Sequence, residues 1–202
     1  MVHRTTTRGL DRLVNFSDAV VAVAVTLLAL PLIDLVEEGD TVSDLFRTRR
    51  VEFVTYVLVF LLMILFWIGH HRFWEKVSDY DVTLIWLNAL WLLSMSLFPV
   101  FAGFDIERGP EDGQAVAYTA LLGALFFVRL LMMVHLYRHR DLRAADVDDD
   151  DLWVAGEVFL VVSTAVVAGL IATWPAQTKI LALFGPILGA YHVLRRRRLQ
   201  TP

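Results

Sequence analysis

Long apolar segments follow one another along this chain of 202 residues, and short polar stretches separate them. A helix that crosses a bilayer needs roughly 20 mainly apolar residues, and six segments approach that length. They lie at about 13–33, 52–69, 82–104, 115–137, 152–174 and 178–194. The pattern predicts an all-α, polytopic membrane protein in which residues 1–202 form a single domain of six transmembrane helices.

Composition agrees with this prediction. Hydrophobic residues make up 57% of the chain and charged residues 20%, and the mean hydropathy is +0.58. The chain has no cysteine, which excludes disulfides, thiolate metal sites and a cysteine nucleophile. Its net charge of -4 comes largely from an acidic loop at residues 146–151, and no basic surface for nucleic acid is predicted.

The positions of the basic residues predict the orientation. If the N-terminus lies inside, twelve of the 18 Lys and Arg residues fall in inner segments and five in outer ones, and Arg129 falls within the fourth span. Positively charged loops stay on the cytoplasmic side. We therefore expect a multi-pass protein with both termini in the cytoplasm. The basic tail Arg195 to Arg198 is a topology anchor or a site for anionic headgroups.

The first apolar segment begins with polar side chains. Arg12, Ser17 and Asp18 lie within seven residues, just ahead of a run of Ala, Val and Leu. Charged groups at membrane depth are costly in hydrocarbon and normally pair with other polar groups. We expect an interhelical or intersubunit polar network whose partners come from the second and third segments: His70, His71 and Asn88. The alternative is a snorkelling Arg12 and an Asp18 favoured by the helix dipole.

A stripe of side chains runs along the same segment. Val23, Leu27 and Leu30 share one helix face, and Thr26 adjoins them. Around the symmetry axis of an oligomer, such a stripe would form apolar rings and one ring of hydroxyls, which is a known way to build an ion pathway. The alternative is ordinary packing, because most membrane helices carry Val, Leu and Ala stripes.

The polar start of this segment resembles a family signature. Arg12, Phe16, Ser17 and Asp18 form the pattern R-x-x-x-F-S-D, and T-L-L follows at Thr26. This arrangement resembles the TMEM175 family of potassium channels. The likeness continues in the run W-I-G-H-H-R-F from residue 67 to residue 73, in L-N-A-L from 87 to 90, and at Pro99.

The resemblance implies a potassium-selective channel of the bacterial type, with one six-helix repeat per chain. It implies a homotetramer in the plasma membrane of a bacterium, in which the first helices line a central potassium pathway. The constriction would map to Val23, Leu27 and Leu30, and Thr26 would contribute to ion selection. The chain has no T-V-G-Y-G run, so a carbonyl filter of that kind is excluded. Val23 is smaller than the family's usual Ile or Leu, which predicts the narrowest point at Leu27 or Leu30.

Other partners and functions are less favoured. We expect no cofactor, no metal apart from the permeating potassium, no soluble substrate and no enzymatic activity, because the serines of the spans have no evident base beside them. The main alternative is a small multi-pass secondary transporter. Such a protein usually shows paired broken helices or repeat symmetry near the membrane midplane, and neither is evident in the sequence.

Three features with charged or titratable side chains leave several interpretations open. Arg129, near the middle of the fourth span, is compatible with an ion pair, a transport role or snorkelling. His70 and His71 diverge by about 100° on a helix, so they are poorly placed to bind one metal, but either could titrate near neutral pH. The acidic loop 146–151 faintly resembles a calcium loop, yet Asp151 stands where such a loop needs Gly.

Overall fold

The computed structural model describes residues 7–33, 41, 43, 47–102, 114–152 and 154–173. The described helices are α1 (Thr7–Leu27), α2 (Leu30–Ile33), α4 (Arg50–Trp74), α5 (Val82–Ser96), α6 (Phe98–Ala102), α7 (Gln114–Arg138), the 3-10 helix η3 (Arg140–Leu142) and α8 (Val154–Thr173). These residues contain no β-strand, only an isolated bridge between Val77 and Arg143. The predicted all-α class is therefore confirmed.

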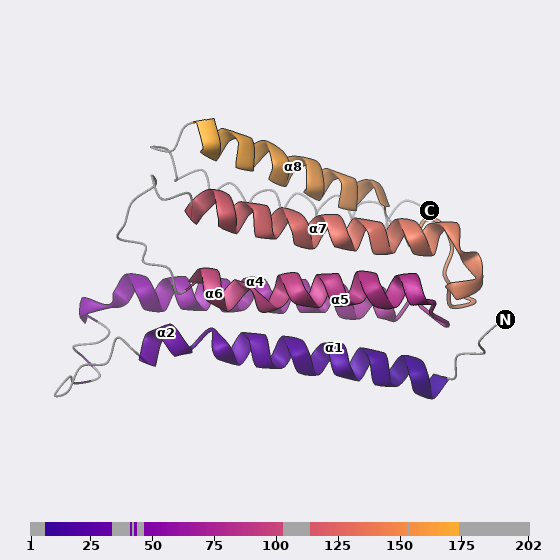
Figure 1. Ribbon diagram of the computed structural model, residues 1–202, viewed down its shortest axis with the longest axis horizontal. Coiled ribbons are helices and arrows are strands. Elements are labelled where there is room, and N and C mark those ends of the chain that lie inside the picture. Colours follow the sequence, from indigo (N-terminus) through magenta and orange to yellow (C-terminus); the bar gives the residue numbers. More distant parts are fainter. Residues whose placement is uncertain are drawn as a thin grey trace.

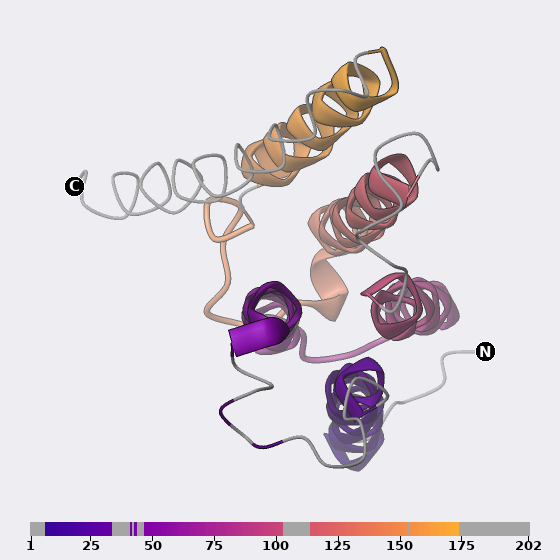
Figure 2. The same cartoon turned by 90° about the vertical axis from the view of Figure 1, so that its left-hand side faces the viewer.

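The long helices run side by side along the longest axis of the molecule (Figure 1). A view along that axis shows α1, α4 and α5 on one side and the α7–α8 pair on the other (Figure 2). Helix α7 packs on both α5 and α8, and α1 packs on both α4 and α5. Helix α7 therefore connects the helices around α1 to α8.

Three of the described helices are long and apolar enough to cross a membrane: Phe53–Trp74, Val82–Val100 and Ala117–Arg138. They correspond to the second, third and fourth predicted segments. A shorter apolar helix, Val154–Val166, lies in the fifth. The sixth segment, 178–194, and the basic tail lie outside the described residues, so the count of six spans stays a prediction.

The first predicted segment is interrupted in the structure. Helix α1 ends at Leu27 and α2 begins at Leu30. In the turn between them, Ala29 N–H donates to the Thr26 carbonyl at 3.2 Å and Leu32 N–H donates to the Ala29 carbonyl at 3.1 Å. Pro31 has no N–H and cannot donate to the Leu27 carbonyl, which explains why the regular helical ladder stops here.

Asp81 joins the start of α5 to α7. Its Oδ1 accepts the Leu84 N–H at 2.8 Å, as an N-cap does, and its Oδ2 lies 2.9 Å from His135 Nε2 of α7. Partial burial raises the pKa of Asp81, but the hydrogen bonds from Leu84 N–H and His135 outweigh it, so the pKa lies below its ordinary value.

The two connections at the same end of the bundle are bonded to each other. Ser78 N–H donates to the Leu142 carbonyl at 2.9 Å, and Ala144 N–H donates to the Lys76 carbonyl at 3.0 Å. These two bonds tie the α4–α5 connection to the α7–α8 connection.

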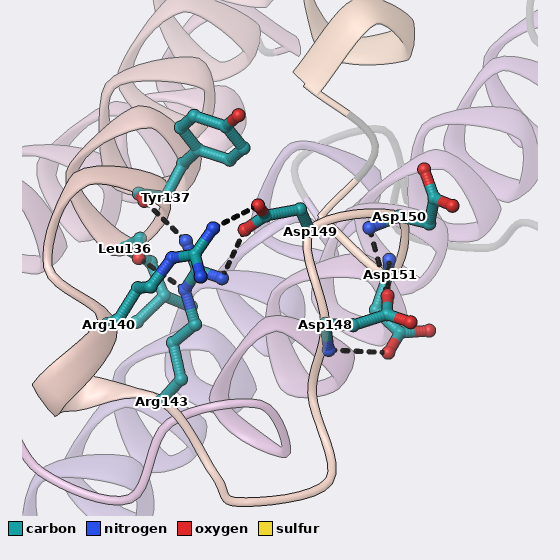
Figure 3. A network of polar contacts seen from close by, with 8 residues as sticks. All are labelled: Leu136, Tyr137, Arg140, Arg143, Asp148, Asp149, Asp150 and Asp151. Atoms are coloured by element: carbon teal, nitrogen blue, oxygen red, sulfur yellow. Dashed lines mark hydrogen bonds and ion pairs between the residues drawn. The ribbon is translucent and has the colours of Figure 1, made fainter.

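Arg143 anchors the acidic loop to this end of α7. Its guanidinium donates to the Leu136 carbonyl at 2.8 Å and to Asp149 at 2.6 Å, and Arg140 also pairs with Asp149 (Figure 3). The hydrogen bond from Arg143 lowers the pKa of Asp149. Within the described part of the chain, no group of three or more His, Cys, Asp or Glu could hold a metal ion.

Candidate functional site

Helix α1 has one face inside its own chain and one face outside it. The buried side chains are Ser17, Val21, Ala24 and Val25, and Leu28 in the turn that follows the helix is buried on the same side. On the other face, Val23 is 57% exposed, Leu27 44% and Leu30, just beyond the helix, 52%. The stripe predicted from the sequence therefore lies on the face of α1 that the chain leaves uncovered.

Thr26 lies on the same exposed side of α1. Its hydroxyl donates to the Val23 carbonyl at 2.8 Å. Because the hydroxyl hydrogen is used in this bond, the oxygen lone pairs remain as acceptors, which is the polarity a cation needs. The stripe thus combines apolar side chains with one acceptor oxygen.

Ser17 is the centre of the contact between α1 and α5. The side chain is buried, and its hydroxyl donates to the Leu13 carbonyl at 2.9 Å while it accepts from Asn88 Nδ2 at 2.9 Å. Asn88 is itself buried. Two residues that lie 71 positions apart in the sequence are therefore joined by a direct hydrogen bond inside the bundle.

Asp18 connects α1 to α4. Its Oδ1 accepts the indole N–H of Trp67 at 2.8 Å, and its Oδ2 lies 4.0 Å from His71 Nδ1. His71 Nε2 in turn lies 4.0 Å from Glu75 Oε1. Trp67 is not among the partners of Asp18 that the sequence predicted. Its position four residues before His71, on the same helix face, was the available signal.

His70 points in a different direction from His71. It is buried, its ring stacks on Trp91 of α5 at 3.7 Å between centroids with planes 2° apart, and its Nε2 accepts from Trp74 Nε1 at 3.0 Å. Two tryptophans, Trp74 and Trp91, therefore contact this histidine. A histidine held in this way packs α4 against α5.

Within one chain, Arg12 and Phe16 lie apart from the other residues of the predicted network. Both side chains are exposed, Phe16 by 61%. Within the part of the chain that the structure describes, Arg12 forms no hydrogen bond or ion pair. The motif therefore divides into Ser17 and Asp18, which bind neighbouring helices, and Arg12 and Phe16, which point away from them.

Arg129 forms an ion pair with Glu157, a partner that the sequence did not reveal. The Arg129 Nε lies 2.9 Å from Glu157 Oε1, and the Glu157 side chain is completely buried. Glu157 lies in the first turn of α8, where the helix dipole favours a carboxylate. Of the three interpretations of Arg129, the ion pair is the arrangement that the structure shows.

Comparison with known proteins points to one family. Residues 12–99 match the family described as "Endosomal/lysosomal potassium channel TMEM175". A potassium channel from a Chryseobacterium species is 30% identical over 89 residues, which are 44% of this chain and 45% of that protein. A potassium channel from Streptomyces collinus is 28% identical over 134 residues, 63% of this chain and 64% of that one.

A mammalian relative matches over a shorter part of its own length. The rat "Endosomal/lysosomal proton channel TMEM175" is 25% identical over 95 residues, 46% of this chain and 19% of that protein. In each of these relatives, the match spans less than two thirds of the relative's own length.

The fold also has a counterpart among solved structures. A crystal structure of a variant of the potassium channel MtTMEM175, in complex with a Nanobody-MBP fusion protein, superposes with a TM-score of 0.64 at 21% identity. The match covers 98% of this chain and 95% of that one. Residues 12–99 are thus similar to the TMEM175 family, a family of ion channels and not of enzymes, and the chain has the fold of a solved channel of that name.

Proposed function

We propose that this chain is a subunit of a potassium channel whose ion pathway is lined by the exposed stripe of α1. The stripe consists of Val23, Thr26 and Leu27 of α1 and continues at Leu30, the first residue of α2. The observation that carries the proposal is the division of α1 into two faces, because the stripe is uncovered while the opposite face is buried against α4 and α5. The bacterial relatives named potassium channels support the choice of ion.

The polarity of α1 fits a helix that is shielded from lipid. Three other helices meet the length and hydropathy of a membrane span, whereas α1 carries Asp11, Arg12 and Asp18. Charges at membrane depth normally face the interior of a bundle or a wet cavity. A single α1 cannot enclose an ion, so several copies must surround the pathway. We propose the homotetramer that the family resemblance implies.

The stripe would act on the ion in two ways. Rings of Val23, Leu27 and Leu30 would narrow the pathway, and apolar constrictions of this kind gate by dewetting. A ring of Thr26 oxygens would replace part of the hydration shell of the cation. Leu27 and Leu30 are larger than Val23, so the narrowest point is proposed at one of these leucines. No cofactor is needed for such a mechanism.

The proposed location is the plasma membrane of a bacterium, with both termini in the cytoplasm. The start of α1 and the ends of α4 and α7 lie at the same end of the bundle (Figure 1). Basic residues gather at that end: Arg8, Arg12, Arg72, Lys76, Arg138, Arg140 and Arg143. This distribution supports a cytoplasmic orientation for that end.

Ion flux through the purified chain in liposomes tests the proposal. We expect potassium to pass more readily than sodium, and Leu27→Ala and Leu30→Ala to change unitary conductance or selectivity because the dewetted section shortens. Leu61→Ala is the matched control, since Leu61 is equally exposed but lies on α4. A folded protein that passes no potassium, or unchanged currents in both stripe variants, would contradict the proposal.

The same recordings separate the alternatives. Resolved unitary currents support a channel, whereas slow, saturating flux without them supports a secondary transporter. Because the rat relative is named a proton channel, a pH-sensitive dye inside the liposomes should record proton flux in parallel. The proposed tetramer requires a protein mass four times 23.0 kDa in detergent, once bound detergent is subtracted.

A further inference from the structure

One short segment of α4 contacts three other helices. Successive residues of a helix point about 100° apart, so neighbours in sequence face different partners. Trp67 donates to Asp18 of α1 at 2.8 Å, and His70 stacks on Trp91 of α5 at 3.7 Å. Gly69, between them, faces Arg129 of α7. The segment 67–70 is therefore where α1, α5 and α7 meet through α4.

Gly69 leaves room for the Arg129 guanidinium. A methyl group at position 69 would collide with one terminal nitrogen of that guanidinium and would lie 3.2 Å from its central carbon. A guanidinium at the end of a flexible side chain could normally move away at little cost. Here it is held on its other side, because Arg129 Nε lies 2.9 Å from the buried Glu157 carboxylate of α8.

The ion pair is therefore part of the packing around α4. Removing one partner of a buried ion pair is strongly destabilising, because the other charge is left in a low-dielectric interior. The Arg129 side chain is largely buried and Glu157 completely so, which makes their relative position well defined. Helix α8 is thus joined through α7 to the same segment of α4 that holds Asp18.

We propose that Arg129 and Glu157 are positioning residues for α1. Their ion pair, seated against Gly69, fixes the segment 67–70 of α4, and this segment in turn holds α1 through Trp67 and Asp18. This inference deepens the proposed channel function. Only the expected effect of the ion pair on ion flux rests on that function. The effect of the ion pair on the packing of α1 does not depend on it.

The first test is a comparison of two glycine substitutions by thermal unfolding of the full chain in detergent. Gly69→Ala should lower the melting temperature by roughly 5 °C because it displaces the guanidinium from Glu157. Gly123→Ala is the control, since a methyl group there would make an ordinary contact at 3.5 Å with Thr164. It should leave the melting temperature unchanged or slightly higher.

The same two substitutions are then made in a neutral background, Arg129→Leu with Glu157→Met. Without the guanidinium, Gly69→Ala should no longer lower the melting temperature, because Ala favours a helix over Gly. An equal fall in melting temperature in both backgrounds would overturn the proposal that the ion pair packs against Gly69.

Hydrogen exchange of the α1 amides at residues 13–21 tests whether the effect reaches α1. We expect exchange at least about tenfold faster in Gly69→Ala than in Gly123→Ala, since local opening reports local stability. Faster exchange confined to α7 and α8 would show that the pair acts only between those helices, and would overturn the proposal. If Gly69→Ala does not fold, Glu157→Gln, which adds no bulk, takes its place.

Ion selectivity supplies the functional readout. The potassium-to-sodium permeability ratio should shift in Gly69→Ala and stay at the wild-type value in Gly123→Ala. An unchanged ratio in both variants would show that the ion pair does not position α1 for ion conduction, and would overturn that part of the proposal. A folded wild-type chain that passes no potassium would instead contradict the proposed channel, and the exchange of the α1 amides would still decide the present inference.

Discussion

The two faces of α1 differ in what covers them. On the inner face, Ser17 and Asp18 find partners on α5 and α4, and Leu28 is 2% exposed. On the outer face, Leu27, the residue just before Leu28, is 44% exposed. One helix thus carries a side that the rest of the chain buries and a side that the chain leaves exposed. Changes on the inner face should act on stability, and changes on the outer face on ion flux.

The pair Leu28 and Leu27 provides the largest expected contrast. Leu28→Ala should lower the free energy of unfolding by roughly 2–5 kcal/mol, because it leaves a cavity in the core. Leu27→Ala should change it by less than about 0.5 kcal/mol, as exposed substitutions usually do. Denaturation in detergent measures both. Equal losses would mean that the two faces are not distinct in the folded subunit.

Asp18→Ala should have the next largest effect. It leaves the Trp67 indole without its acceptor, and a hydrogen bond to a charged group contributes about 1.5–3 kcal/mol. Asp11→Ala is the control, because Asp11 is exposed on the same helix. We expect loss of stability and of assembly in the first variant only, as judged by unfolding and by mass. Normal assembly with altered permeation would assign Asp18 to the ion pathway instead.

Acid should have a smaller effect on stability. It acts on the N-cap of α5, the helix whose Asn88 bonds Ser17. Because the pKa of Asp81 in the folded protein lies below its ordinary value of 3.8, the folded state favours the carboxylate. This stabilisation is present above about pH 4 and is lost as the pH falls through the folded pKa. The neutral variant Asp81→Asn should unfold more easily than wild type at pH 7.

The difference in melting temperature between Asp81→Asn and the wild type should disappear in strong acid, because the wild-type carboxyl is then also neutral. Melting temperatures measured between pH 3 and pH 7 check this expectation. A constant difference across that range would show that the charge of Asp81 contributes nothing to the cap or to the contact with His135.

Thr26→Val should have the smallest effect on stability, within about 0.5 kcal/mol, because the side chain is exposed. Its effect should appear in the potassium-to-sodium ratio, since the acceptor oxygen is lost while the shape is nearly kept. Thr26→Ser keeps the oxygen and should retain the ratio. A ratio that is the same in all three proteins would remove the hydroxyl from ion selection.

Apolar periodicity and the polar start of the first segment together indicated the helical class, three helices able to span a membrane and the resemblance to the TMEM175 family. These features are local. A run of apolar residues in lipid forms a helix because a helix satisfies its own backbone hydrogen bonds. The motif R-x-x-x-F-S-D occupies only one or two turns of a helix. The divergence of His70 and His71 also follows from helix geometry alone.

Only the tertiary structure decided which residues meet. The sequence offered His70, His71 and Asn88 as partners of the motif. In the structure Asn88 bonds Ser17 and His71 lies 4.0 Å from Asp18. His70 instead packs against Trp91, and Trp67 supplies the hydrogen bond to Asp18. Arg129 finds Glu157, 28 residues away and on another helix. Such pairings depend on how the helices rotate and shift against one another, and that arrangement is set by the packing of the whole bundle. The uncovered face of α1 became visible for the same reason, because burial is a property of the assembled helices and of no single segment.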